Sequence, residues 1–280
     1  MTDIPAPHPD KLRLTIRVGS RSLSFSSVTP GGTAHPVTFK PYTVKNGISM
    51  AANLREAFKT ADLLAYTFQH VLVMVDSPVL MIPLDLFESE NLEELYCHSF
   101  PKYEGHLIAH TLLPELNAVA VYSINKDFKL VVTDHYPEAD FCCALAPVWR
   151  YLHQRSFMSR RRKLYGYFHE CSLDVFSFTQ NRFRFCNSFD LSQTPLGSAN
   201  AHDALYYLLC VWKQLALKPE FDELHLVGDI PDKDWLTGEL RQYLQRAYVI
   251  IPASDFNRAP VTRIHDMPFD LVTMFVRGRV

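Results

Sequence analysis

The sequence predicts an α/β protein built from two halves of similar pattern. Each half opens with three short strand segments separated by turn residues, and continues with amphipathic helices that alternate with short apolar strands. Between the halves, residues 155–163 form a polar, basic stretch that is poor in large apolar side chains. The 280 residues are enough for two domains of ordinary size.

In the first half, the chain from Leu12 to Val18 alternates apolar and polar side chains, as a half-buried strand does. A helix is expected to begin near Ser49, because apolar residues follow it at helical spacing. The run from His70 to Val75 is almost uniformly apolar, which suits a strand buried on both faces. The other expected elements are strands at 23–25, 37–39, 79–82, 107–113 and 118–124, turns at 19–20 and 30–32, and helices at 91–97 and 146–154; residues 127–135 fit neither pattern clearly.

The pattern restarts after the basic stretch. A long helix is expected over residues 200–217, with Asn200 as its N-cap and Pro219 beyond its end. Asp232 is expected to open another helix, and residues 269–276 to form a short last one. The expected strands are 164–169, 173–179, 183–189, 224–228 and 248–251.

Three antiparallel strands followed by helix–strand units give a mixed sheet covered on both faces. This order of elements is the one seen in the ribonuclease-H-like fold, and two such units in tandem look like the actin-like ATPase architecture. We therefore predict an α/β fold with mixed α+β sheets in two ribonuclease-H-like lobes, at residues 11–154 and 163–280. A fold of this kind does not by itself specify an activity.

Three segments carry a family resemblance: VLVMVDSPVLMIPLDLF at 71–87, KLYGYFHECSLDVFSF at 163–178 and ELHLVGDIPD at 223–232. They resemble a family of Bacteroidota proteins with a domain of unknown function. The resemblance covers nearly the whole chain and implies a duplicated ribonuclease-H-like, actin-like fold, with no established activity to carry over. By analogy, the fold is also similar to the cytoplasmic assembly domains of type II secretion and type IV pilus systems.

Composition narrows the function classes. Lys and Arg number 28 and Asp and Glu 30, and this net charge of −2 argues against a surface built as a whole for nucleic acid. The first residues lack the apolar core of a signal peptide, and the longest apolar run, Ala204 to Trp212, is shorter than the roughly 20 residues of a membrane span. Six scattered Cys without a CxxC motif suit reduced thiols. We expect a cytoplasmic protein whose partner is another protein, of unidentified kind.

The residues that this fold needs for catalysis are missing from the first strands. A ribonuclease H needs converging carboxylates on two metal ions, one of them in the middle of the first strand. The segment KLRLTIRV has no acid, and KLYGYFHE has only Glu170 at its end. An actin-like ATPase needs Gly-rich phosphate loops with an Asp, but the turn at 19–21 lacks the Asp and the turn at 170–172 lacks the Gly. We predict no catalytic residue and no cofactor.

The best remnant of a nucleotide site is LVGDIPD at 226–232. Actin-like proteins place a Gly-Gly pair there to admit adenosine, whereas this chain has Gly228 followed by Asp229. These two residues are weak candidates for cofactor binding. A strand-to-helix turn with Asp232 as N-cap explains the segment more simply.

Possible metal ligands do not form a convincing set. His106 and His110 are four residues apart, but on a strand they would lie roughly 13 Å apart. His169 and Cys171 would share one strand face without an obvious third ligand. The two acids of Asp232-Lys233-Asp234 suit the dipole at a helix start. We predict no metal site.

The sharpest charge feature is the basic segment Arg160, Arg161, Arg162 and Lys163. It could bind phosphate, RNA or an acidic partner, or it could be a solvated linker between the halves. The leading hypothesis is a non-catalytic interaction or scaffold protein with a degenerate actin-like fold. The alternatives are a degenerate nucleotide-binding protein or ATPase that uses the interlobe cleft, and RNA binding through the basic segment.

Overall fold

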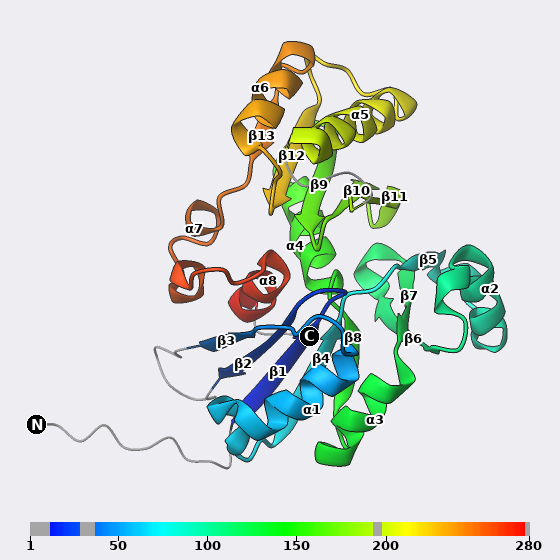
Figure 1. The fold of residues 1–280 in the computed structure, drawn as a ribbon. Helices are drawn as coiled ribbons and strands as arrows, with labels where there is room; N and C mark the ends of the chain where they lie inside the picture. The colour runs from blue at the N-terminus through cyan, green and yellow to red at the C-terminus, as the bar shows by residue number, and fades with distance from the viewer. Residues whose placement is uncertain (1–11, 29–36, 193–197, 278–280) are drawn as a thin grey trace, which may run out of the picture. The chain divides into compact units, whose positions relative to one another are not determined.

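The computed structural model describes residues 12–28, 37–192 and 198–277, which fold into two compact units (Figure 1). Unit 1 takes in the described residues up to 82 together with 87–112 and 120–146. Unit 2 takes in 83–86, 113–119 and the described residues from 147 onward. The lobe limits expected from the sequence, 11–154 and 163–280, stay a prediction.

The main sheet of unit 1 has five strands and carries two helices. They are β1 (Arg13–Val18), β2 (Leu23–Val28), β3 (Thr38–Tyr42), α1 (Met50–Thr60), β4 (His70–Val75), α3 (Lys126–His135) and β8 (Asp140–Cys143). The strand order is β3-β2-β1-β4-β8; the first three strands are antiparallel, while β4 and β8 run parallel to β1. Helices α1 and α3 pack together, and Phe58 stacks on His135 with ring centroids 3.8 Å apart.

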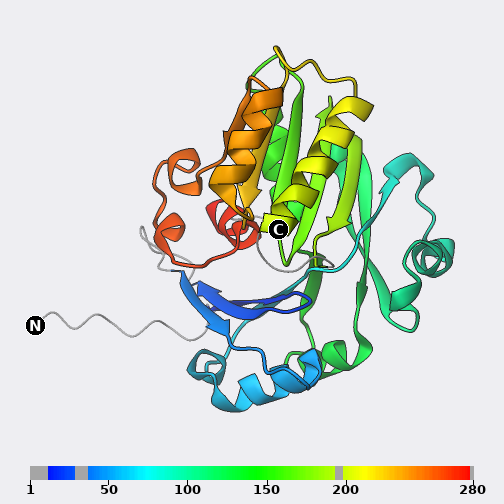
Figure 2. The same ribbon diagram turned by 45° about the horizontal axis from the view of Figure 1, so that its top comes forward.

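Unit 2 repeats this arrangement. Its elements are β9 (Lys163–His169), β10 (Ser172–Thr179), β11 (Arg182–Asp190), α5 (Ser198–Gln214), β12 (Glu223–Gly228), α6 (Lys233–Tyr243) and β13 (Ala247–Val249). The order β11-β10-β9-β12-β13 has the same strand directions as in unit 1. Helices α5 and α6 lie side by side over one face (Figure 2), where Leu208 and Leu240 join Leu164 and Leu226 in a single core. The predicted mixed α/β sheets are confirmed.

The remaining elements are a three-stranded sheet and short helices. The sheet has the order β5-β7-β6 and the strands β5 (Leu80–Pro83), β6 (Leu107–Leu113) and β7 (Ala118–Ile124). The remaining α-helices are α2 (Leu92–Ser99), α4 (Ala146–Ser156), α7 (Pro252–Asp255) and α8 (Phe269–Arg277). Within the described ranges, none of the helices combines the length and the apolar character that crossing a membrane requires.

Most predicted elements are confirmed, but the capping residues differ. Helix α1 begins near Ser49 as predicted, and Ser49 is its N-cap, with a side chain that accepts the N–H of Ala52. Helix α5 begins at Ser198, so Asn200 lies inside it and the predicted N-cap is wrong. Asp232 occupies the N-cap position of α6 as predicted, but it has a left-handed backbone with φ of +38° and its side chain makes no capping hydrogen bond.

The ambiguous residues 127–135 belong to helix α3, and strand β8 was not foreseen. The predicted turn at 30–32 lies outside the described residues. Strand β1 is buried on both faces rather than one, since Thr15 and Arg17 are only 6% and 2% exposed. The buried charge of Arg17 therefore needs a partner within unit 1.

Candidate functional site

The carboxyl ends of parallel strands are where open α/β sheets bind ligands. In unit 1, Asp76 directly follows β4, and its backbone N–H donates to the carbonyl of Val18 at the end of β1 (2.8 Å). In unit 2, Asp229 directly follows β12 and donates in the same way to Phe168 of β9 (2.9 Å). The two aspartates therefore occupy equivalent positions in the duplicated fold.

In unit 1 this position holds a buried ion pair. The guanidinium of Arg17 lies 2.9 Å from the carboxylate of Asp76, and the two side chains are 2% and 8% exposed. Another guanidinium nitrogen of Arg17 donates to the hydroxyl of Ser22 at 2.9 Å, across the β1–β2 turn. The carboxylate of Asp76 is thus engaged within the unit, whereas a metal-bound phosphate would require it to be open.

In unit 2, the backbone geometry at the end of β12 requires a glycine at position 228, whether or not a ligand binds there. The φ of Gly228 is +94°, a conformation that other residues rarely adopt. A Cβ at this position would lie 2.0 Å from the carbonyl oxygen of Phe168, so β12 approaches β9 too closely for any larger residue. The cofactor-binding role suggested for Gly228 and Asp229 stays a prediction.

Acidic side chains of unit 2 near the end of β9 are held by partners of the same unit. His169 pairs with Asp174, and both side chains are buried. Tyr167 stacks on His169 with ring centroids 4.6 Å apart, and its hydroxyl donates to Asp270 at 3.3 Å. The second carboxylate oxygen of Asp270, which is fully buried, accepts the backbone N–H of Leu271 at 2.6 Å. These carboxylates complete a packed polar cluster.

The turn between β9 and β10 consists of Glu170 and Cys171, with φ of +49° and +61°. Left-handed backbone costs roughly 1–2 kcal/mol for a residue other than glycine. A two-residue turn of this kind has no series of glycine N–H groups to cradle a phosphate. This turn therefore does not have the form of a phosphate loop.

The basic segment leads into β9 at the opposite, amino end of the strands, and two of its arginines form ion pairs within unit 2. Arg161 lies 3.3 Å from the carboxylate of Glu223. Arg162 lies 2.6 Å from Asp222, whose side chain is only 1% exposed, and also donates to the carbonyl of Ala216 at 2.9 Å. Two of the arginines thus stabilise buried acids, which a solvated linker would not do.

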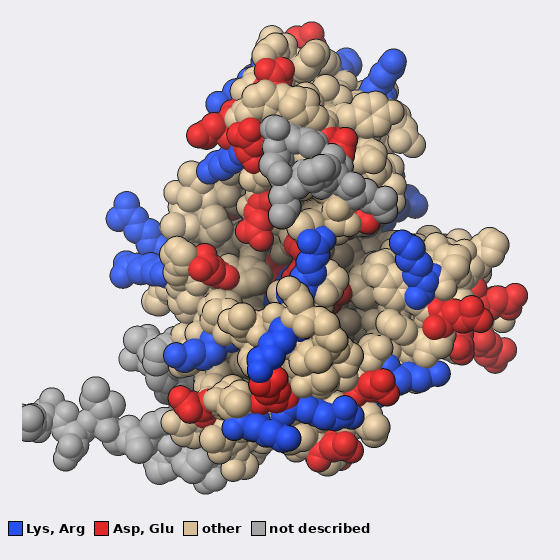
Figure 3. Space-filling model, in the orientation of Figure 1, with Lys and Arg blue, Asp and Glu red and all other residues tan. Residues whose placement is uncertain are grey.

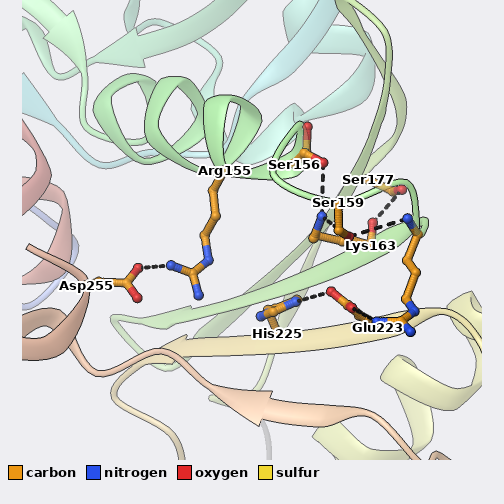
Figure 4. Close-up of polar contacts among 9 residues, drawn as sticks. Arg155, Ser156, Ser159, Lys163, Ser177, Glu223, His225 and Asp255 are labelled. Carbon is orange, nitrogen blue, oxygen red and sulfur yellow. Dashed lines mark hydrogen bonds and ion pairs between the residues drawn. The ribbon is translucent and has the colours of Figure 1, made fainter.

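Lys163, the last residue of the segment, is buried in β9. Its ammonium donates to the carbonyl of Ser156 at 2.9 Å and to the hydroxyl of Ser159 at 3.0 Å (Figure 4). The hydroxyl of Ser177 donates to its backbone carbonyl at 2.8 Å. Burial lowers the pKa of Lys163. This lysine therefore joins the end of α4 to the sheet and is not presented to a ligand.

Glu223 and His225 continue this network on β12 (Figure 4). His225 donates from Nε2 to Glu223 at 3.1 Å, and its Nδ1 is buried without a hydrogen-bond partner among the described residues. Burial lowers the pKa of His225. Burial alone would raise the pKa of Glu223, but hydrogen bonds from His225 and Arg161 outweigh it and lower that pKa. The pair is a neutral imidazole bound to a charged carboxylate.

An ion pair shown in Figure 4 joins α4 to α7. Arg155 pairs with Asp255, and the Tyr151 hydroxyl donates to the same carboxylate. Burial and the charge of Asp255 raise the pKa of Tyr151 to about 12. The Arg155 side chain is therefore also engaged within unit 2, so it adds no free charge to the basic segment.

The histidine pairs considered from the sequence are dispersed. His106 lies edge-on to Tyr103, and burial lowers the pKa of His106. His110 contacts Phe87 instead. Across residues 12–28, 37–192 and 198–277, no group of three or more His, Cys, Asp or Glu side chains is placed to hold a metal ion.

Acidic side chains gather over α2 (Figure 3). Glu88 and Glu90 precede the helix, Glu93 and Glu94 lie in its first turn, and all four are exposed. Acids at a helix start interact favourably with the helix dipole, which is a sufficient reason for them.

Sequence reasoning missed the residues that make the buried pairs at the carboxyl ends. Arg17 and Asp76 are 59 residues apart. Asp174 and Asp270 lie in segments that were read only for their apolar pattern. A polar residue within an otherwise apolar strand, as Asp174 is in LDVFSF, is the signal that could have found them.

Comparison with known proteins identifies the family and the fold. The model of a family described as "Protein of unknown function (DUF3822)" matches residues 6–247. A crystal structure from Bacteroides thetaiotaomicron, described as a protein with actin-like ATPase fold and unknown function, is 30% identical with a TM-score of 0.79, and covers 95% of this chain and 100% of that chain. The predicted family resemblance and actin-like architecture are confirmed. No curated protein matches this chain.

More distant structures have weaker similarity. A PilM–PilN type IV pilus biogenesis complex is 14% identical with a TM-score of 0.48, covering 88% of this chain and 89% of that one. The ethanolamine utilization protein EutJ from Carboxydothermus hydrogenoformans is 10% identical with a TM-score of 0.44, covering 87% and 86%.

Proposed function

The chain belongs to the DUF3822 family of proteins of unknown function, and we propose that it is a cytoplasmic, non-catalytic interaction protein. It keeps an actin-like fold, but internal contacts use the acidic side chains at the carboxyl ends of its sheets. The observation that carries the proposal is the buried Arg17–Asp76 ion pair. The six cysteines, all free thiols, support a reducing compartment.

Energetics support this proposal in unit 1. For Asp76 to bind a metal–phosphate group, its carboxylate would have to leave Arg17. Removing one partner of a buried ion pair costs about 3–5 kcal/mol, since the other charge is left unpaired. This cost corresponds to a loss of about a hundredfold to several thousandfold in ligand affinity. Nucleotide binding at this position is therefore strongly disfavoured.

The contacts in unit 2 point the same way. Asp174 is paired with His169, and Asp270 accepts two hydrogen bonds. The tight contact of Gly228 with Phe168 accounts for the glycine that suggested an adenosine site. A test that replaces Gly228 would disrupt the sheet itself, so Asp229 is the better residue for testing nucleotide binding.

Phosphate release from ATP with Mg²⁺ tests the proposal. We expect the wild-type protein, Asp76→Asn and Asp229→Asn to release phosphate at the same rate as buffer. Turnover by the wild type that is lost in either variant would overturn the proposal, provided that circular dichroism shows a folded variant.

A further inference from the structure

A small hollow in unit 2 is lined by Asn117, Gln180, Asn181 and Arg182. Its volume is about 330 Å³, which lies at the lower end of the range typical of ligand sites. Gln180 and Asn181 form the turn between β10 and β11, and Asn117 lies directly before β7. Every lining side chain is an amide or a guanidinium.

The fold does not use these polar side chains. Among the residues that the structure describes, no hydrogen bond or ion pair engages the side-chain amides of Asn117, Gln180 and Asn181 or the guanidinium of Arg182. By contrast, the guanidinium of Arg184, two residues further along β11, is engaged within unit 2 and donates to the carbonyl of Leu215 at 2.8 Å. The hydrogen-bonding groups of these four side chains are therefore not used by contacts among the described residues.

The backbone around the hollow is held in place by the fold. His153 of α4 is buried and donates from Nε2 to the carbonyl of Gln180 at 2.9 Å. The carbonyl of Asn117 accepts the N–H of Leu84 at 3.0 Å. Asn117 and Gln180 both have left-handed backbone, with φ of +47° and +52°. A site whose backbone is already ordered loses less entropy when a ligand binds.

We propose that this hollow binds a carboxylate that is part of a peptide. A guanidinium pairs with a carboxylate through two parallel hydrogen bonds. One arginine matches one negative charge, whereas a phosphate group would bring up to about two. Side-chain amides both donate and accept, as a peptide group beside the carboxylate requires. This inference specifies the chemistry of the protein partner, and it rests on the proposed function for the choice of a peptide.

Isothermal titration of the full chain in low salt tests the inference with four probes. They are N-acetyl-Ala-Ala-Asp-amide, N-acetyl-Ala-Ala-Ala with a free carboxyl end, succinate, and the neutral N-acetyl-Ala-Ala-Asn-amide. We expect at least one carboxylate peptide to bind with a Kd of about 1 mM or lower. Arg182→Gln should weaken that binding about tenfold or more, because it removes charge-assisted hydrogen bonds. The exposed Arg241→Gln on α6 is the matched control and should bind as the wild type does.

Three results would overturn the inference. They are carboxylate peptides that bind no more tightly than the neutral peptide, succinate that binds as tightly as the peptides, and an equal loss of affinity in Arg182→Gln and Arg241→Gln. The two carboxylate peptides distinguish a side-chain carboxylate from a chain end. Peptide titration and phosphate release from ATP are separate measurements, so a failure of this inference can be told apart from a failure of the proposed function.

Discussion

The guanidinium of Arg17 and the carboxylate of Asp76 meet across the carboxyl ends of β1 and β4, 2.9 Å apart and almost completely buried. The strand registers place Tyr167 of β9 at the position in unit 2 that Arg17 has in unit 1. Tyr167 also bonds an aspartate, Asp270. Both copies of the duplicated sheet thus use this position to hold an acidic side chain inside the unit.

Removal of one partner from the pair should destabilise unit 1 strongly. Asp76→Asn leaves the guanidinium of Arg17 buried without its counter-charge, at an expected cost of about 3–5 kcal/mol. Urea denaturation followed by circular dichroism measures the loss.

The exposed pair of Lys45 and Glu56 provides the control for this measurement. Its side chains are 57% and 34% exposed, so Glu56→Gln should cost less than about 1 kcal/mol. Equal losses of unfolding free energy in Asp76→Asn and Glu56→Gln would show that burial of the Arg17–Asp76 pair does not increase its contribution to stability.

Alanine substitutions at three glycines should separate backbone strain from steric contact. Gly228→Ala meets both a positive φ and the Phe168 carbonyl, and should cost about 3 kcal/mol or more. Gly47 has φ of +86° with nothing within 4 Å of a Cβ, so its replacement should cost about 1 kcal/mol. Gly238 lies within α6 with nothing within 4 Å of an added Cβ, so Gly238→Ala should raise the free energy of unfolding by about 0.5–1 kcal/mol. Thermal unfolding orders the three variants, and a well-tolerated Gly228→Ala would refute the close approach of β12 to β9.

Much of the fold could be predicted because its signals are local. The strands β6 and β7 lie at the residues expected from apolar runs, and helix α1 begins next to Ser49, as expected. Strand β8 was missed because four residues, DFCC, are too few for a periodic pattern. The candidate site was harder, since Arg17 alternates with apolar residues as a solvated side chain would. Only the tertiary pairing with Asp76 shows that its face of β1 is covered.

Low pH should lower the stability of unit 2, because His225 is buried in its neutral form. Burial lowers the folded-state pKa of His225 from 6.5, so the unfolded chain binds a proton more readily than the folded chain. The free energy of unfolding should therefore fall as pH drops below about 6.5. The lowered pKa of Glu223 adds a second loss below its ordinary value of 4.5.

Unfolding midpoints at pH 7.5, 6.5 and 5.5 measure this dependence. His225→Gln should show a shallower loss between pH 6.5 and 5.5 than the wild type. His265→Gln, whose histidine side chain is 91% exposed, should keep the wild-type slope. A His225→Gln slope as steep as that of the wild type would contradict the assignment.

Substitutions of different arginines in the basic segment should change the free energy of unfolding by different amounts. Arg162→Gln leaves Asp222, 1% exposed, without its ion pair and should cost about 2 kcal/mol or more. Arg160 is exposed and without an ion pair in the described part of the chain, so Arg160→Gln should change stability by less than about 0.5 kcal/mol. Urea midpoints compare them, and indistinguishable variants would argue that the segment is a solvated linker.

The central claim is that internal pairing of Asp76, Asp174 and Asp270 near the strand ends leaves this actin-like fold without a nucleotide site. Isothermal titration of the wild-type protein with ATP in the presence of Mg²⁺ tests it most directly. We expect no saturable heat, which corresponds to a Kd weaker than about 1 mM. Saturable, Mg²⁺-dependent binding with a Kd below about 10 μM that is lost in Asp76→Asn or Asp229→Asn would contradict the claim.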